Sequence, residues 1–470
     1  MIDRSRRPPA LLGLLPACLC LLAGTAQAQA QQALSWDDAL QRLRSGSDQL
    51  AAARAGVEHQ EARAEGIARL GGPSVSLLGA AYSYKASLDL NLDPLSQGLN
   101  QIVGRLPPLL GGIVSQLPQL PHSYTLERRN SGETAQLSAF WPLYLGGAAD
   151  AARGLVAAQT AEARAELLGS EHDATALLAQ RYFLTQLARR AAALREAAAE
   201  GVAAHDAAAA KMQAAGVASR LERLQAKAAL EEARHQARKA RSDAELAALA
   251  LARSLKLEAQ PAPSTPLALH SQALPPLPDF LIVALQNHPG LARVAAKKEQ
   301  AAELLRASHA LNRPQVFAFG QRALNHNGDW VAGVGVRVNL WDSLDHAALE
   351  RSHLRQIAQA DATDAQARSD IALLVERQWR ATESAREQYL GLAAQDELAQ
   401  ELLRLRQAGL RQGTSTALDL IDAELNLAKQ RTARAQVAYD YVLALTGLLQ
   451  ACGQLDSLGD YLARADIKLE

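Results

Sequence analysis

Most of the chain carries apolar residues at the spacing of long amphipathic helices. This pattern covers residues 35–70, 148–213 and 219–257 in the first half and residues 278–312, 343–407 and 416–452 in the second. The longest run in each half lasts about 65 residues, which at about 1.5 Å of rise per residue reaches roughly 100 Å. A helix of that length needs lateral packing, so each half is expected to lay its two short helices end to end beside its long one.

Two shorter segments in each half are strand-like, with alternation of apolar and polar residues clearest in one of them, which predicts four β-strands. The clearest segment has an apolar face and a second face of glycines and polar residues. The apolar face carries Trp330, Ala332, Val334, Val336, Val338 and Leu340, and the other face carries Gly333, Gly335, Arg337 and Asn339. The strands are expected at about 73–84, 132–144, 314–324 and 329–341. Aromatic residues lie toward the segment ends, as in the belts of a membrane barrel: Tyr82, Tyr84, Trp141, Tyr144, Trp330 and Trp341.

Alternation of this length is typical of a transmembrane strand, and the alternative is an ordinary half-buried antiparallel sheet. Four strands leave two open edges, which lipid cannot satisfy. If the strands span a membrane, other copies of the chain must therefore close the barrel. Three copies would make a barrel of twelve strands.

The chain contains one motif twice, at an offset of about 197 residues. Gly413, Thr416 and Asp419 in the second copy correspond to Gly216, Ser219 and Glu222 in the first. Glycine permits the left-handed turn that ends one helix, and the hydroxyl can cap the next helix. Each copy therefore predicts the tip of a helical hairpin.

These patterns predict a mainly α fold with a small β part. The fold is expected to consist of a duplicated helix–strand–strand–helix–helix unit. The first repeat is expected at 29–257 and the second at 279–453, joined by a proline-rich linker at 258–278 and followed by a C-terminal tail at 454–470. The duplication is interrupted by an insertion at about 85–128. If the strands form a membrane barrel, this insertion is expected to be an excursion that caps the barrel mouth, and the alternative is a mobile loop of no particular role.

Charge and the first residues narrow the class of protein. The chain has 49 basic and 49 acidic residues, so its net charge gives no reason to expect nucleic-acid binding. Residues 1–28 combine three arginines, an apolar stretch and an Ala-Gln-Ala end, which predicts a cleavable secretory signal. Cys18 could instead mark a lipoprotein, but Pro16 fits that motif poorly.

The sequence contains no motif for catalysis or for binding a metal or a cofactor. Cys452 is the one cysteine after the expected signal, which leaves no intramolecular disulfide. The histidines have no metal-ligand spacing, and no phosphate-binding loop, nucleophile elbow or dinucleotide motif occurs. We therefore expect no enzyme, no cofactor and no metal.

The signal, the duplicated unit and the two tip motifs resemble the TolC-type outer-membrane efflux proteins. The tip motifs are AGVASRLERLQA and QGTSTALDLIDAELNLAKQ, and the resemblance covers about residues 29–461. It implies a homotrimer with a twelve-stranded β-barrel in the bacterial outer membrane, continued by a long α-helical barrel across the periplasm. Such a channel is a passive duct for small molecules or polypeptides in tripartite efflux or type I secretion, and it joins a periplasmic adaptor and an inner-membrane pump.

The resemblance also suggests site residues at the tips. Asp419 and Asp422 are three apart on one helix face, so a trimer would place six carboxylates around its axis, with Glu222 as a third candidate for the constriction. The alternative is that these residues are solvated helix acids, or charges near a helix start that the helix dipole favours. The expected adaptor contacts are Gly216, Val217, Ser219, Gly413, Thr414 and Thr416. Ser415 stands where some family members have an arginine.

Two other functions remain open at the level of sequence. A periplasmic coiled-coil adaptor or scaffold also uses long alanine-rich hairpins, although it would need one hairpin rather than two. An exported enzyme would need a catalytic constellation.

Overall fold

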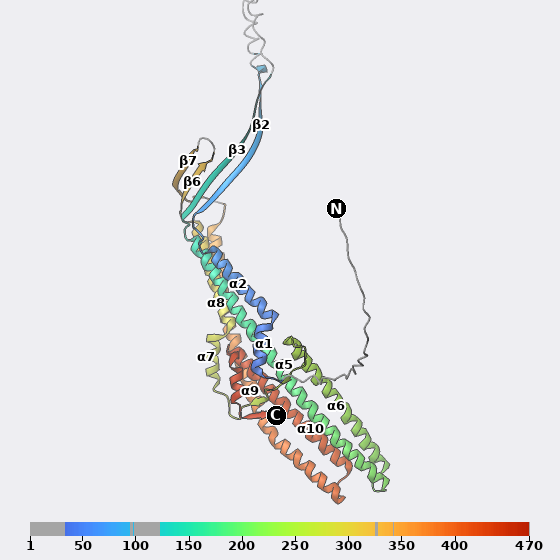
Figure 1. Cartoon of the computed structure of the whole chain (residues 1–470). Coiled ribbons are helices and arrows are strands. Elements are labelled where there is room, and N and C mark those ends of the chain that lie inside the picture. The colour runs from blue at the N-terminus through green and yellow to red at the C-terminus, as the bar shows by residue number, and fades with distance from the viewer. Residues whose placement is uncertain (1–32, 95–96, 98–122, 325–327, 342, 470) are drawn as a thin grey trace, which may run out of the picture.

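The structure is a computed structural model that describes residues 33–94, 97, 123–324, 328–341 and 343–469. The expected signal at 1–28 and the centre of the insertion at 98–122 lie outside the described residues. Within them the chain forms an elongated body of helices that carries a β-sheet at one end (Figure 1). The expectation of a mainly α fold with a small β part is confirmed.

Nine α-helices are described. They are α1 Trp36–Gly46, α2 Asp48–Ile67, α5 Ala148–Ala214, α6 Arg220–Ser254, α7 Leu277–Asn287, α8 Pro289–Leu311, α9 His346–Gln412, α10 Ala417–Ala451 and α11 Leu458–Arg464. None of the described helices has an apolar stretch of the length that a bilayer crossing requires.

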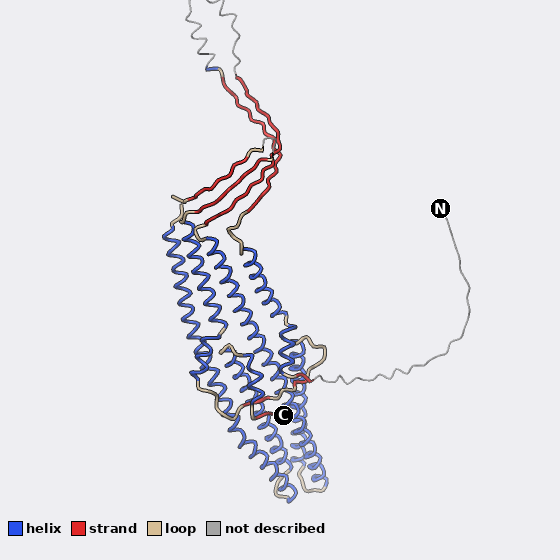
Figure 2. Tube along the Cα trace, turned by 60° about the vertical axis from the view of Figure 1, so that its left-hand side comes forward, coloured by secondary structure: helices blue, strands red, loops and turns tan. Residues whose placement is uncertain are grey.

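The helices pack side by side in one layer. α5 and α9, of 67 residues each, run through the whole helical part, which is roughly 100 Å long at 1.5 Å per residue. Near the sheet the order of neighbours is α2, α5, α8 and α9, and at the far end it is α6, α5, α10 and α9 (Figure 2). In each half the short helices therefore lie above one another beside the long helix.

The structure corrects two of the expected short helices, since each is broken in two. Ser47 ends α1 in an extended conformation, and its hydroxyl accepts a hydrogen bond from the Leu50 N–H at 3.4 Å to begin α2. His288 is extended because it precedes Pro289, which starts α8. Figure 1 shows that α1 meets α2, and α7 meets α8, near the middle of the helical part.

The main sheet has four antiparallel strands in the order β2 Ser74–Asn91, β3 Ser123–Tyr144, β6 Gln315–Ala323 and β7 Trp330–Arg337. β2 and β3 are longer than the sequence indicated, because the flanks of the insertion also pair, from Lys85 with Arg129 to Asn91 with Ser123. β7 is shorter than expected and ends at Arg337.

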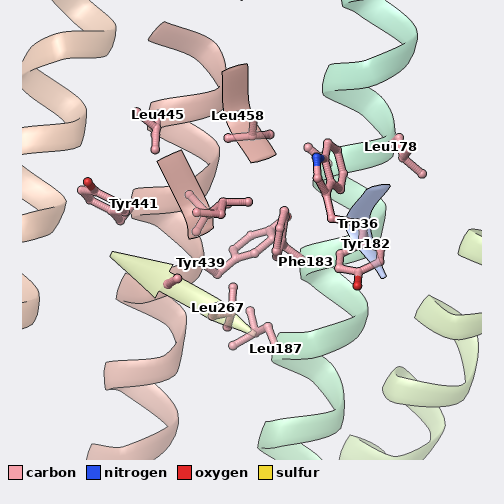
Figure 3. Close-up of a cluster of buried hydrophobic side chains, with 14 of the residues drawn as sticks. Trp36, Leu178, Tyr182, Phe183, Leu187, Leu267, Tyr439, Tyr441, Leu445 and Leu458 are labelled. Atoms are coloured by element: carbon pink, nitrogen blue, oxygen red, sulfur yellow. The ribbon is translucent and has the colours of Figure 1, made fainter. Parts of the chain in front are cut away.

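The largest buried core, here called the waist, joins residues of α1, α5, α10, the linker and the tail, and Figure 3 shows part of it. Trp36 of α1 packs edge-on against Tyr182 of α5 and is stacked with Phe183, with ring centroids 5.7 Å apart in both pairs. The Tyr182 hydroxyl is fully buried; it donates to the Leu34 carbonyl at 2.6 Å and accepts from the Thr265 N–H at 2.9 Å. These bonds join the N-terminal segment and the linker to α5.

The linker and the tail both form part of this core. β4 Ala262–Pro263 pairs with β1 Ala33–Leu34, and β5 Leu267–Leu269 pairs with β8 Ile467–Leu469. The tail also contributes the short 3-10 helix η2 Leu455–Ser457 and α11, whose Leu455, Leu458 and Leu462 are buried. The linker and the tail, which the sequence predicts only as connecting and terminal segments, thus form part of the buried core.

Candidate functional site: the hairpin tips and the sheet faces

The first tip joins α5 to α6 at the end of the molecule farthest from the sheet (Figure 1). Gly216 takes φ +75°, a left-handed conformation that glycine adopts without strain. Ser219 caps α6: its hydroxyl accepts from the Glu222 N–H at 3.1 Å, and the Glu222 carboxylate accepts from the Ser219 N–H at 2.6 Å. Val217 lies between these residues with 73% of its surface exposed.

The second tip, between α9 and α10, has the same construction. Gly413 takes φ +73°, and Thr414 donates its N–H to the Gly409 carbonyl at 2.9 Å. Thr416 caps α10 by accepting from the Asp419 N–H at 3.1 Å, and Asp419 accepts in return from the Thr416 N–H at 2.9 Å. The two predicted caps, Ser219 and Thr416, therefore both complete reciprocal capping boxes.

The three acidic candidates differ in what their carboxylates contact. Glu222 and Asp419 both fold back onto their caps, and Asp419 also lies 3.5 Å from the Arg406 guanidinium. Asp422, one turn further along α10, is exposed and has neither a hydrogen bond nor an ion pair to any described residue. Of the three, Asp422 presents the free carboxylate.

The cap sets the charge of Asp419. Hydrogen bonds from the backbone and side chain of Thr416, with a smaller contribution from Arg406, hold the pKa of this carboxyl below its usual value. Asp419 is therefore fully ionised at neutral pH, and its negative charge stabilises the N-terminal end of α10 by interacting with the helix dipole.

Leu418, Ile421 and Leu425 recur at helical spacing along α10 and attach the second tip to the first hairpin. Ile421 is 1% exposed and packs with Val202 and Ala209 of α5, and Leu418 and Leu425 flank this cluster. One polar contact spans the same interface: the His205 Nε2 atom lies 3.8 Å from the Glu424 carboxylate. Sequence reasoning missed this pair, because nothing in the local pattern relates residues more than two hundred positions apart.

The sheet at the other end has one face that is almost entirely apolar. This face, here called the apolar sheet face, carries Val75 and Leu77 of β2, Leu137 and Trp141 of β3, Val316 of β6, and Trp330, Val334 and Val336 of β7. Val75, Val334 and Trp330 expose 69, 68 and 76% of their surface, and no described segment covers them. In water such a surface would be costly, at about 25 cal/mol for each Å².

The opposite face, here called the mixed sheet face, combines polar and aromatic side chains. Ser76, Gln136, Ser138 and Gln321 share it with a cluster of rings from Phe140, Phe317 and Phe319. Phe317 lies over Gly335, where an added Cβ would come within 2.7 Å of its ring. The absence of a side chain at Gly335 thus leaves space for the ring of Phe317.

The register corrects part of the expected aromatic belts. Trp141, Tyr144 and Trp330 belong to the apolar sheet face, as expected. Tyr82 and Tyr84 do not, because Tyr82 pairs with Gly132 and points to the same side as Phe140. Two hydrogen-bonding edges of the described sheet, along β2 and β7, have no partner strand.

The described residues contain no group of three or more histidine, cysteine, aspartate or glutamate side chains that could hold a metal ion. Cys452 is buried, burial raises the pKa of its thiol to about 11, and the thiol donates to the Phe280 carbonyl at 3.6 Å. This thiol is therefore not nucleophilic at neutral pH.

No protein-family model and no curated protein matches the chain. Several solved structures are similar to it. The outer membrane protein VceC from Vibrio cholerae is 15% identical with a TM-score of 0.69, over 89% of this chain and 96% of that one. The CmeC outer membrane channel of Campylobacter jejuni is 13% identical with a TM-score of 0.68, over 92% of this chain and 90% of that one.

The open state of the MtrE outer membrane channel from Neisseria gonorrhoeae is 17% identical with a TM-score of 0.68, over 89% of each chain. At these identities the likeness shows the fold, and it extends over nearly the whole chain. The chain thus has the fold of these outer-membrane channels, in agreement with the resemblance that the tip motifs suggested.

Proposed function

We propose, from this fold, that the protein is a homotrimeric outer-membrane channel and serves as the passive exit duct of a tripartite efflux or type I secretion system. The observation that carries the proposal is the sheet: an exposed apolar face and two unpaired edges, at one end of helices roughly 100 Å long. In this proposal the apolar sheet face contacts outer-membrane lipid, and the helices extend into the periplasm.

Closure by identical copies would satisfy both sheet edges. A lipid bilayer has no hydrogen-bond partners for unpaired backbone groups, so a sheet within it must be closed. If β7 of one copy pairs with β2 of the next, three copies form a barrel of twelve strands. The mixed sheet face would then line the lumen, where water can solvate Gln136 and Gln321.

The helices support the same arrangement. At the tip end α6 and α9 are the outer helices of the layer, and each leaves leucines uncovered. Leu221 and Leu224 of α6 are 65 and 55% exposed, and Leu398 and Leu405 of α9 are 69 and 54% exposed. A ring of three copies would bring α6 of one beside α9 of the next, which would bury both sets and continue the barrel as an α-helical barrel.

The tips are the proposed site of gating. Three inward-facing copies of Asp422 would form a ring of free carboxylates that favours cations, while Asp419 and Glu222 would hold the tips in shape through their caps. Opening would require the contact between α10 and α5 near Ile421 to change. Among the solved structures with this fold, MtrE is described in an open state.

The turn residues are the proposed contacts with a periplasmic adaptor, which would link the channel to an inner-membrane pump. Gly216, Val217, Ser219, Gly413, Thr414 and Thr416 lie at the extreme end of the molecule, where a partner could approach them end-on (Figure 2). Val217 is the most exposed apolar residue among them. The cargo would be small molecules or polypeptides, and the pump would supply the energy.

A pair of matched substitutions on β7 tests the lipid-facing assignment. Val334→Lys places a charge on the apolar sheet face, which costs about 2–4 kcal/mol near the middle of a membrane. Val331→Lys places the same charge on the mixed face, where the proposal puts water. We expect Val334→Lys to lower the amount of trimer in the outer-membrane fraction and Val331→Lys to leave it near the wild-type amount.

The wild-type protein and Val331→Lys should both give discrete conductance steps in planar lipid bilayers. Equal assembly of Val334→Lys and Val331→Lys, or a wild-type protein that is monomeric and soluble without detergent, would contradict the proposed function. The second result would instead favour a periplasmic adaptor or scaffold.

A further inference from the structure

β2 and β3 continue beyond the other two strands as a two-stranded ribbon (Figures 1 and 2). β6 ends at Ala323, which pairs with Gln136, so only β2 and β3 remain past that row. The ribbon, defined here as residues 82–91 and 123–132, pairs without a break from Tyr82 and Gly132 to Asn91 and Ser123. It adds ten rows of residues to the sheet, roughly 33 Å at about 3.3 Å per residue.

The apolar side of β2 changes from one face to the other where the ribbon begins. Within the sheet the odd-numbered positions are apolar, as at Val75 and Leu77. Within the ribbon the odd-numbered positions are polar, and the even-numbered positions are mainly apolar. The polar ones are Ser83, Lys85, Ser87, Asp89 and Asn91, and the even ones are Tyr82, Tyr84, Ala86, Leu88 and Leu90.

β3 follows the same change. Its Glu127 pairs with Ser87 on the polar face of the ribbon and forms ion pairs with Lys85 and Arg129. Its Leu126 pairs with Leu88 on the apolar face, where Arg128 and Asn130 are the polar exceptions. Side chains alternate strictly along a strand, so the inversion is a property of the sequence and not of a register slip.

The apolar face of the ribbon is uncovered within one described chain. Leu88, Leu90 and Leu126 expose 56, 46 and 53% of their surface. Tyr82 and Tyr84 stack with ring centroids 6.4 Å apart, and Tyr82 lies over Gly132. This face continues the side of the sheet that carries Phe140, which the proposed function places toward the lumen.

Lipid is a poor candidate to cover this face. β6 and β7, with 9 and 8 residues, already have about the length that a membrane strand needs. The ribbon begins beyond the row at which β6 ends, so it would stand outside the hydrocarbon layer. The side that continues the apolar sheet face carries most ionised residues of the ribbon, as expected for a segment outside the membrane: Lys85, Asp89, Glu127 and Arg129.

We propose that the apolar faces of three ribbons, one from each copy, pack together around the trimer axis and narrow the outer mouth of the channel. This inference rests on the proposed function, because it requires the threefold barrel. Threefold symmetry brings the same residue of each copy to the axis, so Leu88 would meet Leu88 and Leu90 would meet Leu90.

The test uses two adjacent cysteine substitutions in the full-length protein. Leu88→Cys lies on the apolar face, and Ser87→Cys on the polar face serves as the matched control. The natural Cys452 is buried and should not react. After the trimer of each variant has been established by native mass spectrometry, a short bis-maleimide should cross-link Leu88→Cys to a dimer band in denaturing gels and leave Ser87→Cys uncross-linked.

A second readout keeps the inference testable if cysteine disturbs the packing. Leu88→Ser combined with Leu126→Ser should raise the single-channel conductance by about two-fold or more, since an apolar constriction limits ion flow by excluding water.

Trimers in which Leu88→Cys gives no dimer band and the double variant has wild-type conductance would overturn the ribbon packing and leave the proposed function standing. A Leu88→Cys residue that is shielded from maleimide without cross-linking would also overturn it, because another segment would then cover the face. A protein that is not a trimer would contradict both the ribbon packing and the proposed function.

Discussion

At the scale of single residues, the tips show how one carboxylate can serve the fold while its neighbour stays free. Asp419 is bonded to Thr416 and lies near Arg406, whereas Asp422 has no partner among the described residues. The two acids are three positions apart and look equivalent in the sequence. Their roles should therefore separate in experiments that read stability and ion selectivity independently.

Asp419→Asn and Asp422→Asn form a matched pair for that purpose. Because its folded-state pKa is lowered, Asp419 contributes stability above its usual pKa of 3.8, and the contribution is lost as the pH falls through the lowered value. Asp419→Asn should lower the thermal midpoint, by the equivalent of about 0.5–1 kcal/mol, and reduce the loss of stability on acidification. Asp422→Asn should leave the midpoint unchanged and shift the reversal potential toward lower cation preference.

Reversal potentials in asymmetric salt and melting curves of the detergent-extracted protein check both variants. Unchanged selectivity in Asp422→Asn would remove this residue from the gate.

Some residue roles followed from the sequence and others did not. The caps at Ser219 and Thr416 were predicted, because capping is a local property of the sequence. The hydrogen bond between the Thr416 N–H and the Asp419 carboxylate was not predicted, since the alternative to a gate was a solvated acid or a charge favoured by the helix dipole. The ion pair of Arg406 with Asp419 and the contact of His205 with Glu424 join different helices, so local patterns carry no signal for them.

At the scale of elements, the sequence located the long helices and the strand centres but not the breaks and strand ends. The periodicity of α5 and α9 continues over many turns, whereas a single Ser47 or His288 is enough to divide a shorter helix. The flanks of the insertion were not expected to pair, because the apolar residues and repeated prolines of the insertion as a whole are not typical of a plain strand.

A glycine at the end of α10 fixes how the tail approaches the waist. Gly453 takes φ +69°, and an added Cβ would lie 2.5 Å from the Asn287 carbonyl oxygen at the break between α7 and α8. Gly453→Ala should lower stability by about 1–3 kcal/mol, because it adds backbone strain and a clash with main-chain atoms.

Gly56→Ala is the control for that substitution. Gly56 lies within α2 with nothing within 4 Å of an added Cβ, so alanine there should be neutral or stabilising by up to about 1 kcal/mol. Circular dichroism melting curves compare the two variants. Equal midpoints would mean that the tail does not depend on the close approach at Gly453.

At the scale of the whole molecule, a single described chain leaves surfaces uncovered that the proposed trimer and the lipid around it would cover. The apolar sheet face, the unpaired edges of β2 and β7, and the leucines on α6 and α9 all remain uncovered in the described chain. The duplication and the count of four strands were readable from the sequence. The joining of linker and tail into the waist core was not, since it depends on contacts such as that of Tyr182 with Thr265.

The mass of the intact assembly tests the central claim most directly. The protein should be extracted from outer membranes with a mild detergent and measured by native mass spectrometry. We predict a complex of three identical chains, because three copies of a four-stranded sheet close the barrel and leave no free edge. A single chain that stays in solution without detergent would contradict the account.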